Sequence, residues 1–94
     1  MDKIGINRTI FKFVEKDLER YDNYVKEIAN KVINELSKEE KEKLLKISDY
    51  SGVHFGLGLY IRNNYIYNKI DLNVDADDMS YDIFNKIIEM LKNN

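Results

Sequence analysis

The residues best suited to chemistry gather in one stretch, 50–67, which reads YSGVHFGLGLYIRNNYIY. It holds three of the four glycines, the only histidine and four of the seven tyrosines, and Arg62 is its one fully charged residue. A guanidinium can bind a phosphate or carboxylate through two hydrogen bonds, while amides can read the edge of a base and tyrosine rings can stack on it. The stretch therefore predicts a site for an anionic, nucleotide-like ligand, or a protein-binding hot spot. The predicted ligand-binding residues are His54, Gly58, Tyr60, Arg62, Asn63, Asn64, Tyr65 and Asp78.

A structural role for Arg62 is the alternative. Three carboxylates, Asp75, Asp77 and Asp78, follow at the start of the last predicted helix. An internal ion pair between Arg62 and one of them would clamp that helix onto the central segment. The sequence leaves both interpretations open.

Catalysis is the least favoured class. His54 could act as a general base, since imidazole titrates near neutrality, but no recognised motif pairs it with a serine or threonine, and the chain has no cysteine. Gly56 and Gly58 lack the third glycine of a dinucleotide fingerprint and the lysine of a P-loop. We expect a non-enzymatic protein without a cofactor.

Residues 71–82 also resemble a calcium-binding loop. Oxygen-bearing residues fall at positions 1, 3, 5, 7 and 12 of a frame like that of an EF-hand: Asp71, Asn73, Asp75, Asp77 and Asp82. Ala76 stands where the turn requires glycine, and an aspartate replaces the bidentate glutamate. An acidic helix start, which complements the positive end of the helix dipole, explains these residues better. No metal site is predicted.

Composition limits the remaining classes. The chain has 94 residues, of which 44% are hydrophobic, and this fits a single domain over 1–94. Its net charge of −2, with acids and bases interspersed, argues against general binding to nucleic acid. No apolar run approaches the roughly 20 residues that span a bilayer. The chain contains no cysteine, so it has no disulfide that would require an oxidising compartment. We expect no membrane association and a cytoplasmic location.

The first 36 residues predict one long amphipathic helix, with Asn7 or Thr9 as its cap. Apolar residues recur at steps of three and four in the order Phe11, Val14, Leu18, Tyr21, Val25, Ile28 and Val32. A helix of this length, on the order of 40 Å, exceeds the width of a small domain. Either it bends near residues 21–23, or its far half packs against a second copy, or it is simply the longest core helix. We expect a homo-oligomer built partly on this helix.

The rest of the chain, 37–92, predicts a helical core. Ser37 and Glu40 form a capping box for a short second helix. The spacing of apolar residues in the central segment, 53–66, fits either a strand or a helix, and a helix is preferred. Residues 70–74 could be a short strand or an extended connector, and a final helix presents Met79, Ile83, Ile87 and Leu91. The prediction is a mainly α, single-domain bundle of about four helices.

Two blocks resemble a family of small uncharacterised proteins of bacteria and phages, a domain of unknown function. Its members are similar in an H-x-G-L-G-x-x-I-R-N-N-aromatic block, here at 54–65, and in a D-D-M-S block, here at 77–80. The resemblance covers residues 37–91 and implies a largely helical fold. It also implies that the two blocks form one constellation: His54, Gly58, Arg62, Asn63, Asn64, Asp77, Asp78, Met79 and Ser80. Family members often carry tryptophan at the position of Tyr65.

Two functions are predicted. The first is a non-catalytic binding protein, of the size of phage or mobile-element accessory factors, that captures a small anionic, nucleotide-like molecule around Arg62, for example a defence signal. The second is a protein-binding inhibitor or immunity-type factor that presents an acidic helical surface to a basic partner.

Overall fold

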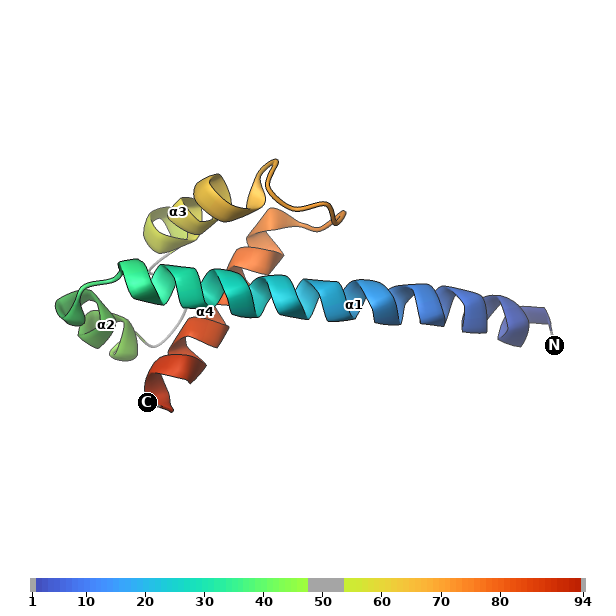
Figure 1. The fold of residues 1–94 in the computed structure, drawn as a ribbon, viewed down its shortest axis with the longest axis horizontal. Coiled ribbons are helices and arrows are strands. Elements are labelled where there is room, and N and C mark those ends of the chain that lie inside the picture. Colours follow the sequence, from blue (N-terminus) through green and yellow to red (C-terminus); the bar gives the residue numbers. More distant parts are fainter. Residues whose placement is uncertain (1, 48–53, 94) are drawn as a thin grey trace.

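The computed structural model describes residues 2–47 and 54–93, with side chains described from 17 to 47 and from 56 to 93. The chain is helical through most of this length (Figure 1). Its elements are α1 (Asp2–Glu35), α2 (Lys38–Leu45), α3 (Leu59–Ile61) between two π-helical turns (His54–Gly58 and Arg62–Ile66), and α4 (Ala76–Lys92). We refer to the continuous stretch 54–66 as the central helix. The fold is the mainly α, four-helix domain that the sequence predicts.

Helix α1 runs without a break from Asp2 to Glu35, so the expected cap at Asn7 or Thr9 is wrong, and of the three alternatives for this helix the bend at 21–23 is excluded. At 1.5 Å per residue it is about 50 Å long. The molecule measures 56 × 28 × 22 Å, with a radius of gyration of 15.8 Å, whereas a compact chain of this length would have about 12 Å. The N-terminal part of α1 projects beyond the other described elements (Figure 1).

The capping box of α2 is confirmed. The backbone N–H of Glu40 donates to the hydroxyl of Ser37 at 3.1 Å, and the backbone N–H of Ser37 donates to the carboxylate of Glu40 at 2.8 Å. These bonds satisfy amides that a helix start leaves without an intrahelical partner, so they fix where α2 begins.

The central segment is helical, as preferred over a strand. Its last turn closes with the wide i→i+5 bond from Tyr67 N–H to the carbonyl of Arg62, at 2.9 Å. The chain then leaves the helix through Asn68, whose φ of 58° lies in the left-handed region that asparagine tolerates better than most residues. Residues 70–74 form an irregular connector and not a strand, which is the second of the two alternatives.

Helix α4 is the centre of the fold and packs against α1, α2 and the central helix. The side chain of Asp75 caps it by accepting from the backbone N–H groups of Asp77 and Asp78, at 2.9 and 3.1 Å. Three of its predicted apolar residues, Met79, Ile83 and Ile87, are fully buried. The buried core comprises Val25, Ile28, Ala29, Val32, Ile33, Leu44, Ile61, Ile66, Met79, Ile83, Phe84 and Ile87.

The apolar residues of α1 that recur at steps of three and four differ in how far they are buried. Val25, Ile28 and Val32 lie in the core, and Tyr21 is partly buried. Leu18 is 58% exposed, and the side chains of Phe11 and Val14 lie outside the described part. Within the described ranges, no helix is both long and apolar enough to span a membrane.

Candidate functional site

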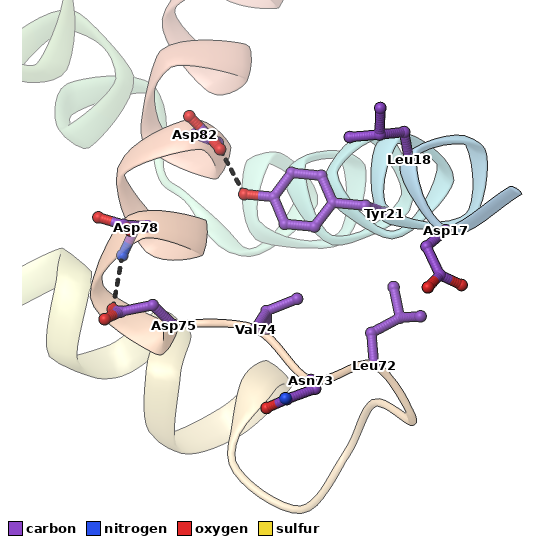
Figure 2. A pocket seen from close by; sticks show the side chains of 9 residues that line it. All are labelled: Asp17, Leu18, Tyr21, Leu72, Asn73, Val74, Asp75, Asp78 and Asp82. Atoms are coloured by element: carbon purple, nitrogen blue, oxygen red, sulfur yellow. Dashed lines mark hydrogen bonds between the residues drawn. The ribbon is translucent and has the colours of Figure 1, made fainter. Parts of the chain in front are cut away.

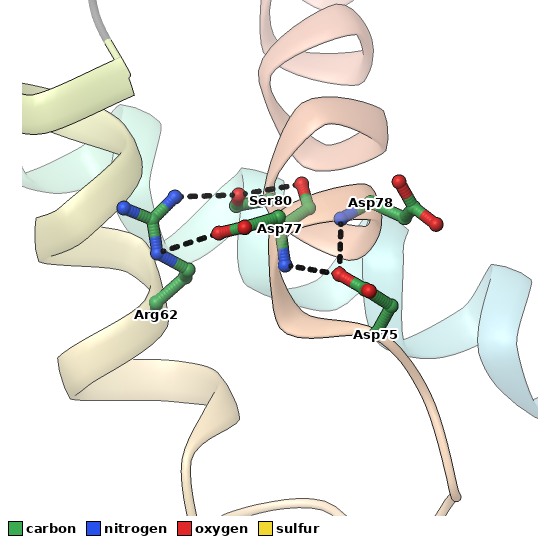
Figure 3. Close-up of polar contacts among 5 residues, drawn as sticks. All are labelled: Arg62, Asp75, Asp77, Asp78 and Ser80. Atoms are coloured by element: carbon green, nitrogen blue, oxygen red, sulfur yellow. Dashed lines mark hydrogen bonds and ion pairs between the residues drawn. The ribbon is translucent and has the colours of Figure 1, made fainter.

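Arg62 lies between the central helix and α4 and is only 4% exposed (Figure 3). Its Nε lies 3.4 Å from Oδ1 of Asp77, and its Nη1 donates to the hydroxyl of Ser80 at 3.1 Å. The Ser80 hydroxyl in turn donates to the backbone carbonyl of Asp77 at 2.9 Å. The internal ion pair with Asp77 is thus present, and it joins the two sequence blocks that the family resemblance groups together.

This arrangement favours a structural role for Arg62. A buried guanidinium needs hydrogen-bond partners, and Asp77 and Ser80 supply them from the first turn of α4. A ligand phosphate would have to compete with both. Capture of a ligand around Arg62 stays a prediction, and the observed contacts do not favour it.

Tyr60 and Tyr65 contact α1 instead of Arg62. Their hydroxyls donate to the two carboxylate oxygens of Glu35, at 3.0 and 2.5 Å, and their rings meet edge to face with centroids 6.3 Å apart. The hydrogen bond to Glu35 is the main cause that raises the pKa of both phenols. The two tyrosines therefore fasten the central helix to the end of α1.

The other predicted site residues do not converge with these. Asn63 and Asn64 are exposed, and the amide of Asn64 donates to the carbonyl of Tyr60 at 2.8 Å. Gly58 is buried inside the central helix. His54 belongs to the same helix, but its side chain lies outside the described part. Asp78 is exposed and faces a different region of the molecule.

That region is a groove of about 520 Å³ between α1, the connector and the start of α4 (Figure 2). We call it the acidic groove. Four of the residues that line it are aspartates, and three carry aliphatic side chains, of which Leu18 is the most exposed. No basic residue is among its described lining residues: Asp17, Leu18, Tyr21, Leu72, Asn73, Val74, Asp75, Asp78 and Asp82.

Hydrogen bonds from α1 hold the walls of the acidic groove in place. Tyr21 donates to Asp82 of α4, and Tyr24 donates to Asp71 of the connector at 2.7 Å. Arg20 also pairs with Asp71, at 2.5 Å. Burial, followed by the bond to Asp82, raises the pKa of Tyr21, while the bond from Tyr24 and the charge of Arg20 lower that of Asp71. The groove is therefore a preorganised surface rather than a gap between loose segments.

The aspartates of the frame that resembles an EF-hand each have a different partner in the structure. Asp71 binds Arg20 and Tyr24, Asp75 caps α4, Asp77 pairs with Arg62, and Asp82 accepts from Tyr21. Across the described residues, no cluster of three acidic or histidine side chains could hold a metal ion.

A second groove, of about 340 Å³, lies between α1 and the turn that follows the central helix. We call it the lysine groove. Lys31 and Lys69 stand on its walls, and Nζ of Lys31 is 3.2 Å from Oε1 of Glu27. Two predicted ligand residues, Asn64 and Tyr65, line it as well. The full lining is Tyr24, Glu27, Ile28, Lys31, Asn64, Tyr65, Lys69 and Ile70.

Comparison of the chain with models of protein families, with curated proteins and with solved structures finds no match. The family resemblance based on the two sequence blocks stays a prediction, and the function has to be argued from the geometry.

Sequence reasoning assigned Asp75 and Asp82 to a helix start or to a rejected calcium frame, and it placed Asp78 in the predicted ligand site around Arg62. It found Leu18 as part of a helical seam. It did not place these residues together, because they meet only when the connector docks on α1. The one local signal was the crowding of aspartates between 71 and 82.

Proposed function

We propose that this protein is a non-catalytic protein-binding factor, of the inhibitor or immunity type, whose acidic groove takes a basic, apolar segment of a partner protein. The observation that carries the proposal is the groove itself: aliphatic side chains on a wall shared by α1 and the connector, with four aspartates and no basic residue among the described lining.

The aliphatic part of the groove supplies the affinity. Leu18 is 58% exposed in the free chain, and Leu72 and Val74 are partly exposed beside it. Burying a leucine side chain contributes about 1.5–3 kcal/mol, so covering these three residues gives a strong reason for association. Hot spots of protein interfaces combine such apolar contacts with a polar rim that excludes water.

The carboxylates of the groove determine which partner proteins it favours. Asp17 stands on α1 beside Leu18, Asp78 and Asp82 stand on α4, and Asp75 caps that helix (Figure 2). Arg20 lies 3.9 Å from Asp17, so the charge of the groove is mainly negative and is carried most fully by the aspartates of α4 and its cap. A mainly negative surface speeds the encounter with a basic partner and disfavours acidic partners. Lysine or arginine interleaved with leucine or isoleucine in the partner would match both parts of the groove. Phosphate-bearing ligands would be repelled from it.

The experiment is a titration with a synthetic helical peptide that carries lysine and leucine at heptad spacing, followed by fluorescence anisotropy at low and at physiological salt. We expect micromolar binding that weakens with salt, and a loss of about tenfold in affinity for Asp17→Asn with Asp78→Asn. The matched control is Glu39→Gln with Glu42→Gln, which removes the same charge from α2, away from the groove. Equal affinity in both variants, or no binding by the monomeric chain, would refute the proposal.

A second candidate is capture of a small anion, and one observation favours it: Asn64 and Tyr65 share the lysine groove with Lys31 and Lys69. Here the anionic ligand of the sequence prediction would sit on two lysines, and Arg62 would act only as a clamp. Cyclic dinucleotides and inorganic phosphate are suitable probes for a calorimetric titration.

Lys31→Gln with Lys69→Gln should then lower the affinity for the probe about tenfold, since each lysine contributes a direct charge to the groove. Lys38→Gln with Lys43→Gln, on α2, is the control for net charge. Loss of binding in a folded Arg62→Ala variant would place the anion at Arg62 and reject the lysine groove. Absence of binding by either probe would remove this candidate.

A further inference from the structure

The charges of the chain are divided unevenly along its length. Residues 1–16 contain four basic residues, Lys3, Arg8, Lys12 and Lys16, and two acidic ones, which gives a net charge of +2. The whole chain has a net charge of −2, so residues 17–94 carry −4. The boundary falls within α1, just before Asp17 and the acidic groove.

The segment 3–16 is also rich in apolar residues. Six of its fourteen residues are isoleucine, phenylalanine or valine, and Arg8, Lys12 and Lys16 follow one another at steps of four. Positions four apart are neighbours on the surface of a helix. Arg8, Lys12 and Lys16 therefore occupy one row along the helix, and positions that carry apolar residues lie next to that row. This is the composition that the acidic groove requires of an occupant.

The segment cannot reach the groove of its own chain. Helix α1 is continuous from Asp2 through Tyr21, so 3–16 is the straight extension of the helix that forms one wall of the groove. In Figure 1 it projects away from α4 and the central helix. A basic segment and an acidic groove on one rigid helix can meet only between two molecules.

From this complementarity, and resting on the proposed function of the groove, we infer that the groove's partner is a second copy of this chain, whose α1 segment 3–16 occupies the acidic groove while its own groove receives the segment of the first. The two copies are related by a two-fold axis, with their α1 helices antiparallel. Each contact is then made twice, which is the property of an isologous dimer.

The arrangement pairs opposite charges in both halves of the interface. The second copy's segment 3–16, with four basic residues and one acidic, meets four aspartates of the first, and the reverse pairing is identical. Leu18, which is exposed in the single chain, is covered by the apolar residues of the second copy's segment.

The test uses two charge-reversed variants of the full chain. One carries Arg8→Glu and Lys12→Glu, and the other Asp17→Lys and Asp78→Lys. The first variant changes the net charge of segment 3–16 from +3 to −1, and the second changes that of the four groove aspartates from −4 to zero. Each variant alone therefore loses the attraction between segment and groove and should be monomeric by light scattering after size exclusion. Mixed in equal amounts they should form heterodimers, because the unchanged groove of the first variant then meets the unchanged segment of the second, and the introduced lysines meet the introduced glutamates.

The wild-type chain should have twice its 11.2 kDa mass at tens of micromolar protein. The control Glu39→Lys with Glu42→Lys, on α2, should remain dimeric, and circular dichroism checks that every variant is folded. A variant that does not fold is replaced by its neutral form, Arg8→Gln with Lys12→Gln or Asp17→Asn with Asp78→Asn, which should raise the dimer dissociation constant at least about tenfold.

The outcomes separate the two proposals. A monomeric wild-type chain that still binds the lysine–leucine peptide through the groove rejects the second copy and leaves the proposed function standing. Dimers that persist in both reversed variants place the interface elsewhere and also reject the inference. A monomer that binds no peptide rejects both.

Discussion

Replacing Arg62 with alanine should lower the free energy of unfolding by about 3–4 kcal/mol. The change removes two buried methylene groups, at about 0.8 kcal/mol each, and a hydrogen bond to Ser80 that contributes about 1 kcal/mol. The ion pair with Asp77 adds at most about 1 kcal/mol, because that carboxylate is 65% exposed and keeps much of its hydration. A domain of this size has about 5–14 kcal/mol of stability, so the variant should still fold.

Urea denaturation followed by circular dichroism measures this loss, and two further variants apportion it. Arg62→Met keeps most of the buried stem and should cost about 2 kcal/mol. Asp77→Asn should cost about 1 kcal/mol or less, and Lys43→Ala, which breaks an exposed pair on α2, should cost no more than about 0.5 kcal/mol. An Arg62→Ala loss below about 1 kcal/mol would refute the clamp, whereas an equal loss in Asp77→Asn would show that the ion pair, and not the buried stem, carries most of it.

The remaining predictions concern the core, the caps, pH and metal. Ile83→Ala should cost about 2–5 kcal/mol in urea denaturation, because the side chain is fully buried in α4. Ser37→Ala should cost about 1 kcal/mol by the same measurement, through loss of the capping box. The pKa of Tyr21, raised by burial, and that of Tyr65, raised by its bond to Glu35, favour the neutral phenol in the folded chain. The contribution of these two phenols to the free energy of unfolding should therefore be level with pH below about 10 and fall above it, and Tyr21→Phe with Tyr65→Phe should flatten that fall in alkaline urea titrations. Millimolar calcium should leave the melting temperature unchanged, and a rise that Asp75→Ala abolishes would contradict the assignment of these aspartates to separate partners.

Local patterns predicted the helices because their signals are contained in short windows. The capping box needs only Ser37 and Glu40, and both of its hydrogen bonds are present. The apolar positions Met79, Ile83 and Ile87 repeat every four residues, and all three are buried. The continuity of α1 was harder to predict, because its length exceeds the width of a compact domain and a bend near 21–23 was therefore one of the alternatives.

The candidate site was harder to predict because it depends on contacts between distant segments. The central helix turns its side chains in different directions, so Tyr60 and Tyr65 meet Glu35 of α1 while Arg62 meets Asp77 of α4. Residues that lie close together in the sequence stretch 50–67 therefore do not form one site in the structure.

The acidic groove depends on contacts between residues that lie even farther apart in the sequence. Its connector wall is held by Asp71, which Arg20 and Tyr24 reach from positions 51 and 47 residues away in the sequence. No window of local sequence contains that contact. Only the docked fold shows that Leu18 and Asp78 face one surface.

A photoreactive leucine at position 72 tests the central claim, that the acidic groove binds a basic, apolar protein segment, most directly. The purified chain is prepared as a mixture of isotopically heavy and light molecules and irradiated, and the cross-linked peptides are identified by mass spectrometry. The account predicts cross-links from position 72 to residues 3–16 of another molecule, and their loss in Asp17→Asn with Asp78→Asn. Cross-links confined to the same chain, even with the lysine–leucine peptide in excess, would contradict it.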